Sequence, residues 1–542
     1  MSVTHQKEGP TDTSPAGERR FMNLTQMLHR MARARPDAVA TSFLSRTTNW
    51  ANLKERVARL AAGLRRLGLS EGDRVAILAL NSDRFTEYYF AVWWAGGVVT
   101  PLNTRWSVNE NAYSLNDSDA RILFVDDAYT NIAADLRDAA GSLETLIYIG
   151  EGDCPDGMID YEPLIASAEP ADDALRCEDD LAGLFYTGGT TGFPKGVMLG
   201  HRGLWFNALL LAQYSSLDRQ AVLLHAAPMF HLADGCAALG ATMAGGRHVY
   251  VPSFDPEGVL DLIETQRVTH ALLVPTMIGL VLQSPAFSPQ RLQCLETIIY
   301  GASAMPRGLL RALMERLPHV ELIQAYGQTE MSPIVSILDA RDHVLAQDGA
   351  QADKLASAGK VALGCDAKIV DKDGVEVGVG EVGEIVARSP GSMLGYWKQP
   401  EQTQATLSQG WVRTGDGGYF DADGYLHIVD RIKDVIITGG ENVFSTEVES
   451  AISTFPGIAA VAVIGIPSEK WGEAVHAIVI PQPDAAPTEA EIIEHCRGHI
   501  ANYKLPRSIE FRKKPFPLSG SGKVLKRELR EPFWKSKERS VN

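Results

Sequence analysis

One stretch, Tyr186-Thr-Gly-Gly-Thr-Thr-Gly-Phe-Pro-Lys-Gly196, places three threonines, four glycines and one lysine directly after the apolar run Leu181-Ala-Gly-Leu-Phe-Tyr186. Glycines allow successive backbone N–H groups to converge on an anion, the threonines add hydroxyl donors, and Lys195 adds a positive charge. The spacing fits neither the Walker loop nor the dinucleotide fingerprint. A flexible surface turn is the alternative interpretation of this composition. The strand leading in and the lysine after a proline favour a polyphosphate-binding loop.

Length and charge narrow the class of protein. With 542 residues the chain is too long for one hydrophobic core, so we expect two or more domains with a cleft between them. The net charge of −16 argues against nucleic-acid binding. Basic residues gather only in the tail after Phe511, which is either a solvated face or an attractive surface for a polyanionic small molecule.

The cysteines and the N-terminal residues indicate the cellular compartment of the protein. The cysteines are scattered, with no CxxC pair and no Cys/His cluster at zinc-ligand spacing, as is typical of a reduced cytoplasmic protein. Residues 1–20 are polar and lack the apolar core of a signal peptide, so we expect a disordered arm. No apolar run reaches the ~18–20 residues that span a bilayer, and we expect no transmembrane segment.

Helical periodicity alternates with short β-rich runs over most of the chain. Leu53, Val57, Leu60 and Leu64 lie on one helical face, and residues 74–78 form an apolar strand pattern before a second helix at 85–94. The alternation returns between residues 248 and 325. It predicts an α/β fold of mainly parallel sheets flanked by helices, with ligands bound beyond the carboxyl ends of the strands.

Four polar clusters directly follow predicted strands, and we expect them to share one rim. They are the loop after Tyr186, Pro228-Met-Phe-His231, Gly301-Ala-Ser303 and Tyr326-Gly-Gln-Thr-Glu330. Singly, His231 is more often a core histidine and Glu330 a surface carboxylate. Together the clusters supply a phosphate cradle, a histidine, a slot for a flat base and a carboxylate for the Mg²⁺ of a nucleotide.

Five motifs, in chain order, resemble the core motifs of the adenylate-forming superfamily, which holds acyl-CoA synthetases, peptide-synthetase adenylation domains and luciferases. They are residues 186–196, Tyr326-Gly-Gln-Thr-Glu330, Trp411-Val-Arg-Thr-Gly-Asp416, Asp430-Arg-Ile-Lys-Asp434 with Gly439-Gly440, and Pro517-Leu-Ser-Gly-Ser-Gly-Lys523. The resemblance covers residues 24–532. One departure is Gly188, which stands where the family more often has serine and removes one hydroxyl near the phosphates.

The resemblance implies a domain plan and a reaction. It predicts an N-terminal adenylation domain at 21–430, a hinge at 431–434 and a small mobile α+β C-terminal domain at 435–542. A carboxylate attacks the α-phosphate of MgATP to give acyl-AMP and pyrophosphate, and the thiol of coenzyme A then displaces AMP. Adenylation exchanges oxide for AMP, a far better leaving group. The implied cofactors are ATP, Mg²⁺ and coenzyme A.

The resemblance also implies roles for individual residues. The catalytic residues are Lys523, which bridges the attacking carboxylate and the α-phosphate, with His231 and Glu330. Thr187 and Glu330 are the expected Mg²⁺ ligands or neighbours, and Gly440 opens the tunnel for the pantetheine arm. The expected nucleotide-binding residues are Thr187, Gly188, Gly189, Thr190, Thr191, Lys195, Gly301, Ala302, Ser303, Tyr326, Gly327, Thr329, Asp416, Arg431 and Lys433. In this set Asp416 accepts both ribose hydroxyls.

The acyl pocket is expected to use the residues after His231, residues 300–305 and residues 331–335. Most of these are small or apolar, which favours a hydrophobic tail. These stretches hold no lysine or arginine, and Asp234 is expected to repel a second carboxylate. A medium- or long-chain fatty acid is the first prediction, and an aryl acid such as a cinnamate or benzoate is the alternative.

Three other functions share most of these motifs. They are an adenylation enzyme that loads a carrier protein, a luciferase-like oxygenase and a non-catalytic nucleotide-binding regulator. The combination of Lys523, Glu330 and Asp416 argues against the regulator, and CoA-dependent release of AMP separates the ligase from all three. Many members of the superfamily are dimers, so a homodimer is compatible with the resemblance.

Overall fold

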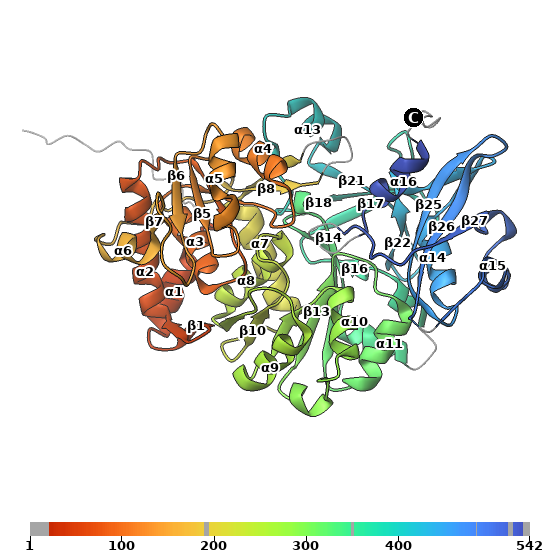
Figure 1. Ribbon diagram of the computed structural model, residues 1–542, viewed down its shortest axis with the longest axis horizontal. Coiled ribbons are helices and arrows are strands. Elements are labelled where there is room, and N and C mark those ends of the chain that lie inside the picture. Colours follow the sequence, from red (N-terminus) through yellow and green to blue (C-terminus); the bar gives the residue numbers. More distant parts are fainter. Residues whose placement is uncertain (1–20, 189–193, 348–351, 484, 519–523, 535–542) are drawn as a thin grey trace, which may run out of the picture.

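The computed structural model describes residues 21–188, 194–347, 352–483, 485–518 and 524–534 (Figure 1). Within these ranges the strands form four sheets. The first has the order β19 (Gly395–Tyr396), β9 (Lys195–Gly200), β8 (Leu181–Thr187), β4 (Val98–Pro101), β3 (Arg74–Leu78), β5 (Ile122–Val125), β6 (Thr145–Tyr148) and β7 (Ile159–Asp160). The second has the order β16 (Lys360–Val361), β15 (Ile334–Leu338), β14 (Glu321–Gly327), β13 (Thr297–Gly301), β12 (His270–Leu272), β10 (Val222–His225), β11 (Arg247–Tyr250), β1 (Val39–Phe43) and β2 (Arg46–Asn49).

Two smaller antiparallel-rich sheets follow in the chain. The third contains β17 (Asp366–Val370), β18 (Gly383–Arg388), β20 (Leu407–Ser408), β21 (Trp411–Phe420) and β22 (Leu426–Arg431). The fourth contains β23 (Ile436–Thr438), β24 (Glu441–Val443), β25 (Ile458–Ser468), β26 (Gly472–Pro481) and β27 (Ser508–Phe511). The fourth sheet, with α14 (Ser445–Ser453), α15 (Glu489–Arg497) and α16 (Lys526–Trp534), builds the small C-terminal part, drawn in blue in Figure 1.

Two helices, α7 (His201–Tyr214) and α8 (Leu232–Ala244), pack against each other between the two large sheets (Figure 1). On one side, Leu204 and Leu239 join the core of α2 (Trp50–Arg66), α3 (Asp83–Trp94) and the first sheet. On the other side, Leu211 and Ala237 pack on strands of the second sheet. Because α7 and α8 carry apolar residues on both faces, they hold the two sheets together.

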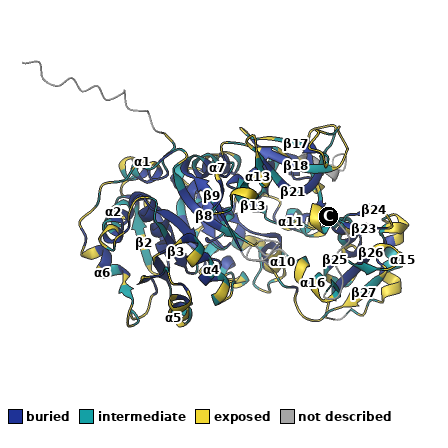
Figure 2. Ribbon diagram, turned by 90° about the horizontal axis from the view of Figure 1, so that it is seen from above, coloured by how far each residue is buried: buried dark blue, intermediate teal, exposed yellow. Residues whose placement is uncertain are grey.

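The remaining helices cover the outer faces, where Figure 2 shows exposed residues over buried strands. They are α1 (Gln26–Ala34), α4 (Val108–Ser118), α5 (Thr130–Ala139), α6 (Tyr161–Ala166), α9 (Pro256–Gln266), α10 (Pro275–Gln283), α11 (Arg307–Arg316), α12 (Ala340–Gln347) and α13 (Pro400–Thr406). Asp255 caps α9 through its side chain, 2.7 Å from the Gly258 amide, as its place before Pro256 favours. In the described ranges no helix combines the length and apolarity needed to cross a bilayer.

The predicted α/β fold is confirmed, including the strand at 74–78 and the strands and helices between residues 248 and 325. One expectation was wrong. The glycine-rich loop follows β8 in the first sheet, whereas the loops after β10, β13 and β14 belong to the second sheet. The four loops therefore line a space between two sheets rather than the rim of one, because sequence alternation reveals strands but not the sheet that each one joins.

Candidate active site

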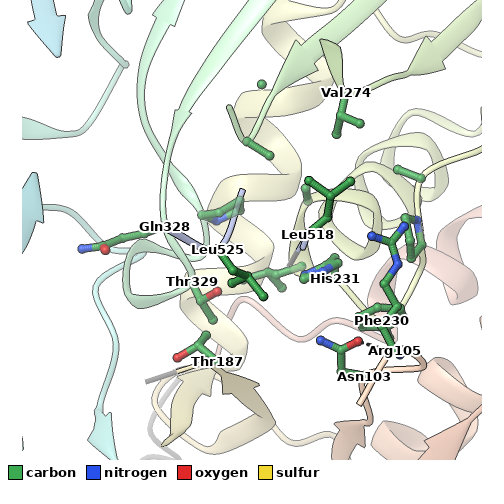
Figure 3. A pocket seen from close by; sticks show the side chains of 18 of the residues that line it. Asn103, Arg105, Thr187, Phe230, His231, Val274, Gln328, Thr329, Leu518 and Leu525 are labelled. Carbon is green, nitrogen blue, oxygen red and sulfur yellow. Dashed lines mark hydrogen bonds between the residues drawn. The ribbon is translucent and has the colours of Figure 1, made fainter. Parts of the chain in front are cut away.

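A cavity of about 1450 Å³ opens where the four predicted loops approach each other. Thr187 and Gly188 reach it from β8, residues 226–228 and 230–231 from β10, Gly301 and Ala302 from β13, and residues 326–330 from β14. The volume exceeds the 300–1,000 Å³ typical of small-molecule pockets, so a nucleotide and a second substrate fit together. Figure 3 shows the hydroxyl groups of Thr187 and Thr329 near each other at one side of this cavity.

Glu330 lines the cavity in the segment that follows β14. Its Oε1 accepts a hydrogen bond from the Tyr396 hydroxyl at 2.8 Å. Lys195, which pairs with Thr187 across β8 and β9, places its Nζ 5.5 Å from the centre of the Tyr396 ring. Burial lowers the pKa of Lys195, and the Glu330 carboxylate partly offsets this effect. The Glu330 carboxylate, the Tyr396 hydroxyl and Lys195 therefore lie close together, although Lys195 is not among the residues that line the cavity.

These oxygen donors fit Mg²⁺ that arrives with ATP. Mg²⁺ prefers oxygen ligands, keeps several waters, and is usually bound through one or two carboxylates plus substrate phosphates. Glu330 and Thr187 both line the cavity, so the oxygen donors expected for this role are available there. Over the described ranges no group of three or more His, Cys, Asp or Glu side chains could hold a metal ion by itself.

Gly301 and Gly327 line the slot expected for the base, and each lies in close contact with a neighbouring backbone. A Cβ on Gly301 would lie 2.3 Å from the Ala325 carbonyl oxygen, and one on Gly327 would lie 1.7 Å from the Pro333 carbonyl oxygen. Both distances are shorter than any tolerated contact, so these positions require glycine. Ala302 lines the same slot with φ of +64°, whereas Ser303 does not line the cavity.

Asp416 lies directly behind two residues of the cavity wall. Its Oδ2 accepts from the Tyr326 hydroxyl at 2.8 Å, and its Oδ1 lies 3.2 Å from Arg431 Nε. Burial and the nearby Asp416 carboxylate raise the pKa of Tyr326, which keeps the phenol protonated as a donor. A carboxylate oxygen has two lone pairs, so Asp416 retains acceptor capacity for ribose hydroxyls.

Asp416→Ala is expected to weaken ATP binding roughly ten- to a hundred-fold, because charge-assisted hydrogen bonds contribute about 1.5–3 kcal/mol. Titration calorimetry of ATP measures this loss. Asp366→Ala is the matched control, since Asp366 also pairs with an arginine, Arg388, in the same sheet; neither Asp416 nor Asp366 lines the cavity, but Arg431, the partner of Asp416, does and Arg388 does not. Equal ATP affinity of the two variants would remove Asp416 from the site.

The C-terminal part closes one side of the cavity. Arg431 and Lys433 line it, and Arg530 of α16 donates to the Lys433 carbonyl and pairs with Asp434 at 2.5 Å. Burial, together with the nearby Arg431, lowers the pKa of Lys433 to about 8. Leu518 and Leu525 point into the cavity beside His231 and Thr329 (Figure 3). Lys523, Gly189, Thr190 and Thr191 lie outside the described residues.

Gly440 is not brought to the cavity. It lies in the turn between β23 and β24 with φ of +89°, and a Cβ there would meet nothing within 4 Å. The neighbouring Gly439 amide donates to the Trp471 carbonyl at 2.8 Å. This turn and Trp471 form a separate face of the C-terminal part.

His231 lines the cavity as the N-cap residue of α8, with its ring centre 4.5 Å from that of Phe230. The expectation for Asp234 was wrong. Asp234 is fully buried, does not line the cavity, and lies 2.7 Å from His225 Nδ1. In the chain it lies between the cavity-lining residues Ala233 and Cys236, but adjacent helix residues point about 100° apart, and its side chain bonds to His225 instead of entering the pocket wall.

Several lining residues were missed in the sequence. Asn103, Arg105 and Trp106 follow β4 and enter the cavity wall, with Arg105 close to Phe230 in Figure 3. The signal that revealed the other loops, a polar cluster after an apolar strand, also exists here in Val98-Val-Thr-Pro-Leu-Asn-Thr-Arg-Trp106. Tyr396, the partner of Glu330, gave no such signal because 66 positions separate the two residues.

Comparison with known proteins gives the family. A model described as AMP-binding enzyme matches residues 28–397, and one described as AMP-binding enzyme C-terminal domain matches residues 447–523. The chain belongs to the AMP-binding enzyme family. It is an AMP-forming acid–thiol ligase that uses ATP, Mg²⁺ and coenzyme A, as the five motifs implied.

Two relatives and one solved structure show how close the similarity is. A feruloyl-CoA synthase from Amycolatopsis sp is 39% identical over 93% of the ligase and 98% of its own length. An indoleacetate–CoA ligase from Aromatoleum aromaticum is 34% identical over 94% of the ligase and 98% of its own length. The ATP-bound MatB from Rhodopseudomonas palustris has a TM-score of 0.84 at 32% identity, covering 94% of the ligase and 99% of that chain.

Proposed function

We propose that the ligase activates a monocarboxylic acid with an apolar tail, first to the acyl-adenylate and then to the CoA thioester. The observation that carries this proposal is the apolar end of the cavity. Between α7, α8 and the second sheet it is lined by Leu211, Ala233, Cys236, Leu272, Ile299 and Ile334. Burial raises the pKa of the Cys236 thiol to about 12, so this wall carries no charge at neutral pH.

A medium- or long-chain fatty acid is the first candidate for this tail. Each CH₂ group buried against the aliphatic wall contributes about 0.8 kcal/mol of binding free energy, and the wall offers few hydrogen-bonding partners to a polar tail. None of these six side chains is strongly polar, since the Cys236 thiol is only a weak hydrogen-bond donor. A 34% identical relative named long-chain-fatty-acid–CoA ligase FadD13, from Mycobacterium tuberculosis, supports this candidate.

An aryl acid is the second candidate, and the relatives favour it. Feruloyl-CoA synthase and indoleacetate–CoA ligase, the relatives compared above, both take their names from acids with rings. A flat ring fits a wall of small residues such as Ala233 and Cys236 as readily as an alkyl chain does. The lining residues accommodate an alkyl tail and an aryl tail alike, and an activity assay with both kinds of acid distinguishes them.

Pyrophosphate exchange with a panel of acids is the decisive experiment. Exchange is expected to depend on an added apolar acid and to need no CoA, because adenylation precedes the thiol. The panel compares straight-chain acids of increasing length with benzoates, cinnamates and their hydroxylated forms. Exchange by cinnamates alone would select the aryl candidate, and ATP binding without exchange by any acid would contradict the ligase proposal.

The second half-reaction needs a surface that recognises coenzyme A. Trp471 lies on the face beside Gly439 and Gly440, with Lys470 Nζ 4.7 Å and Arg507 Cζ 5.8 Å from its ring. An exposed aromatic ring between two cations suits the adenine and phosphates of coenzyme A. We therefore assign this face to the CoA step, after a rotation of the C-terminal domain about residues 431–434.

A carrier protein remains the alternative thiol, because one relative, 33% identical, is named fatty acid–[acyl-carrier-protein] ligase ScoC. Trp471 and its cations favour free coenzyme A. CoA-dependent release of AMP, compared with release driven by a phosphopantetheinylated carrier protein, distinguishes the two. A homodimer and a cytoplasmic location stay predictions from the sequence.

A further inference from the structure

Four buried polar side chains form one hydrogen-bonded row behind the acyl end of the cavity. Asp234 Oδ2 lies 2.7 Å from His225 Nδ1, and His225 Nε2 lies 2.9 Å from His248 Nδ1. His248 Nε2 in turn lies 3.1 Å from Thr242 Oγ1. All four residues expose 0% of their surface, so a charge here persists only because a partner offsets its desolvation.

The row ties together the two elements that flank the cavity loop at residues 226–231. His225 is the last residue of β10, directly before the loop, and Asp234 is the third residue of α8, directly after it. The Asp234–His225 bond therefore joins the two ends of the loop. Asn81 fixes its middle, since its amide donates to the Ala227 carbonyl and accepts from the Met229 amide, both at 2.8 Å.

The direction of the hydrogen bonds follows from proton counting. Burial lowers the pKa of His248 well below its usual value, and His225 adds to this effect, so His248 is neutral and carries one N–H. If that N–H donates to Thr242, whose hydroxyl then donates to the Ala238 carbonyl, His225 donates its Nε2–H to His248. If it donates to His225, the proton of that ring lies on Nδ1. When the Asp234 carboxylate carries no proton, His225 Nδ1–H donates to it in both arrangements.

The row meets α8 at two points, Asp234 near the start of the helix and Thr242 near its end, and the Asp234–His225 bond is the one next to the cavity loop. The His225 ring stacks on those of His248 and Tyr250, with centroid distances of 5.2 and 4.9 Å. Tyr250 is held by Thr86, whose Oγ1 lies 2.8 Å from the phenol oxygen. The rings therefore keep His225 rigid on the sheet, and only its bond to Asp234 reaches α8.

We propose that Asp234 and His225 are positioning residues for the acid substrate, which fix the loop 226–231 and the start of α8. The inference rests on the proposed function, because it requires the acid tail to contact this wall. Phe230, His231 and Cys236 line the cavity, whereas Asp234 does not. Thr187 is the last residue of β8 in the other sheet, and β12 lies between β10 and the strand β13 that carries Gly301, so we expect the pair to affect the acid more than the nucleotide.

Kinetics of Asp234→Ala and Asp234→Asn test the proposal. We expect Asp234→Ala to raise the KM for the acid about tenfold or more, while the KM for ATP stays within about twofold, since one hydrogen bond to a charged group is lost. Asp234→Asn is expected to restore the acid KM to within about threefold, because its amide oxygen still accepts from His225 Nδ1–H. An unchanged acid KM in a folded Asp234→Ala enzyme overturns the proposal.

His270→Gln is the matched control. His270 is also a buried, hydrogen-bonded histidine of the second sheet, 2.9 Å from the Ser215 carbonyl, but it lies at the amino end of β12 and outside the cavity lining. It should leave both KM values unchanged. If it raises the acid KM as much as Asp234→Ala does, the effect reflects general destabilisation and the proposal fails.

A second measurement keeps the proposal testable if no acid is activated. Hydrogen–deuterium exchange in peptides covering residues 226–231 should be faster in Asp234→Ala than in wild type, Asp234→Asn or His270→Gln. Equal exchange in all four overturns the inference independently of the proposed function. If Asp234→Ala does not fold, the double variant Asp234→Leu with His225→Phe replaces it, because removing both partners leaves no buried unpaired charge.

Discussion

Lys523→Ala is expected to abolish adenylation while sparing thioester formation from supplied acyl-AMP and CoA. The family resemblance makes this lysine the bridge between the attacking carboxylate and the α-phosphate, where a compact ammonium neutralises both. Loss of one such contact costs on the order of 2.7–4 kcal/mol of barrier, a hundred- to thousand-fold in rate, by analogy with removal of an oxyanion donor. The flanking residues Leu518 and Val524 pair with each other and line the cavity, which supports a role there.

Pre-steady-state assays of the separate half-reactions measure the effect of Lys523→Ala. Lys513→Ala is the matched control, since Lys513 is an exposed lysine of the same basic tail outside the cavity lining. It should leave both half-reactions unchanged. Equal loss of both half-reactions in Lys523→Ala would contradict a role confined to adenylation.

Gly440→Leu is expected to have the opposite profile, with normal adenylation and at least a hundred-fold slower thioester formation if the barrier rises by about 2.7 kcal/mol or more. In the present arrangement a side chain at Gly440 enters open space, so it cannot disturb the nucleotide. After rotation of the domain, the same side chain would stand beside Trp471 in the path of the pantetheine arm.

Strain must be separated from blockage in that variant, because Gly440 has a positive φ that L-residues rarely adopt. Gly424→Leu is the matched control: Gly424 has φ of +80° in an open turn between β21 and β22. Gly440→Ala has the same backbone strain with little bulk and should retain most of the thioesterification rate. A similar loss in all three variants would show that strain, not blockage, is responsible.

The strands that lead into the cavity could be predicted from sequence because each has a local cause, an apolar run that ends in a polar cluster. Residues after β8, β10, β13 and β14 do line one cavity. The binding of phosphate by the glycine-rich loop and of the base beside Gly301 and Gly327 stays a prediction. The pairing of Glu330 with Tyr396 and of Asp416 with Tyr326 could not be predicted in this way. These contacts depend on how separate sheets pack, which short-range patterns do not encode.

The wrong prediction that Asp234 lies in the pocket wall has a second physical reason. Almost every residue of α8 is buried, so its hydrophobic pattern does not distinguish a face toward the cavity from a face toward the sheet. Adjacent residues of a helix point about 100° apart, which follows from 3.6 residues per turn. Without a polar face as reference, placing Asp234 in the pocket wall or behind it required the structure.

The packing of α7 and α8 between the sheets restricts how this enzyme can evolve a new substrate. Leu211, Leu272, Ile299 and Ile334 line the acyl end and also belong to the hydrophobic cluster that joins these helices to the second sheet. Truncating one of them to alanine costs about 2–5 kcal/mol, a large share of the 5–15 kcal/mol that keeps a domain folded. Enlarging the pocket at these positions therefore destabilises the fold. Ala233 on α8 is only partly buried against the cluster, so a larger residue can replace it. A change toward shorter acids is thus expected to cost less folding stability than a change toward bulkier acids.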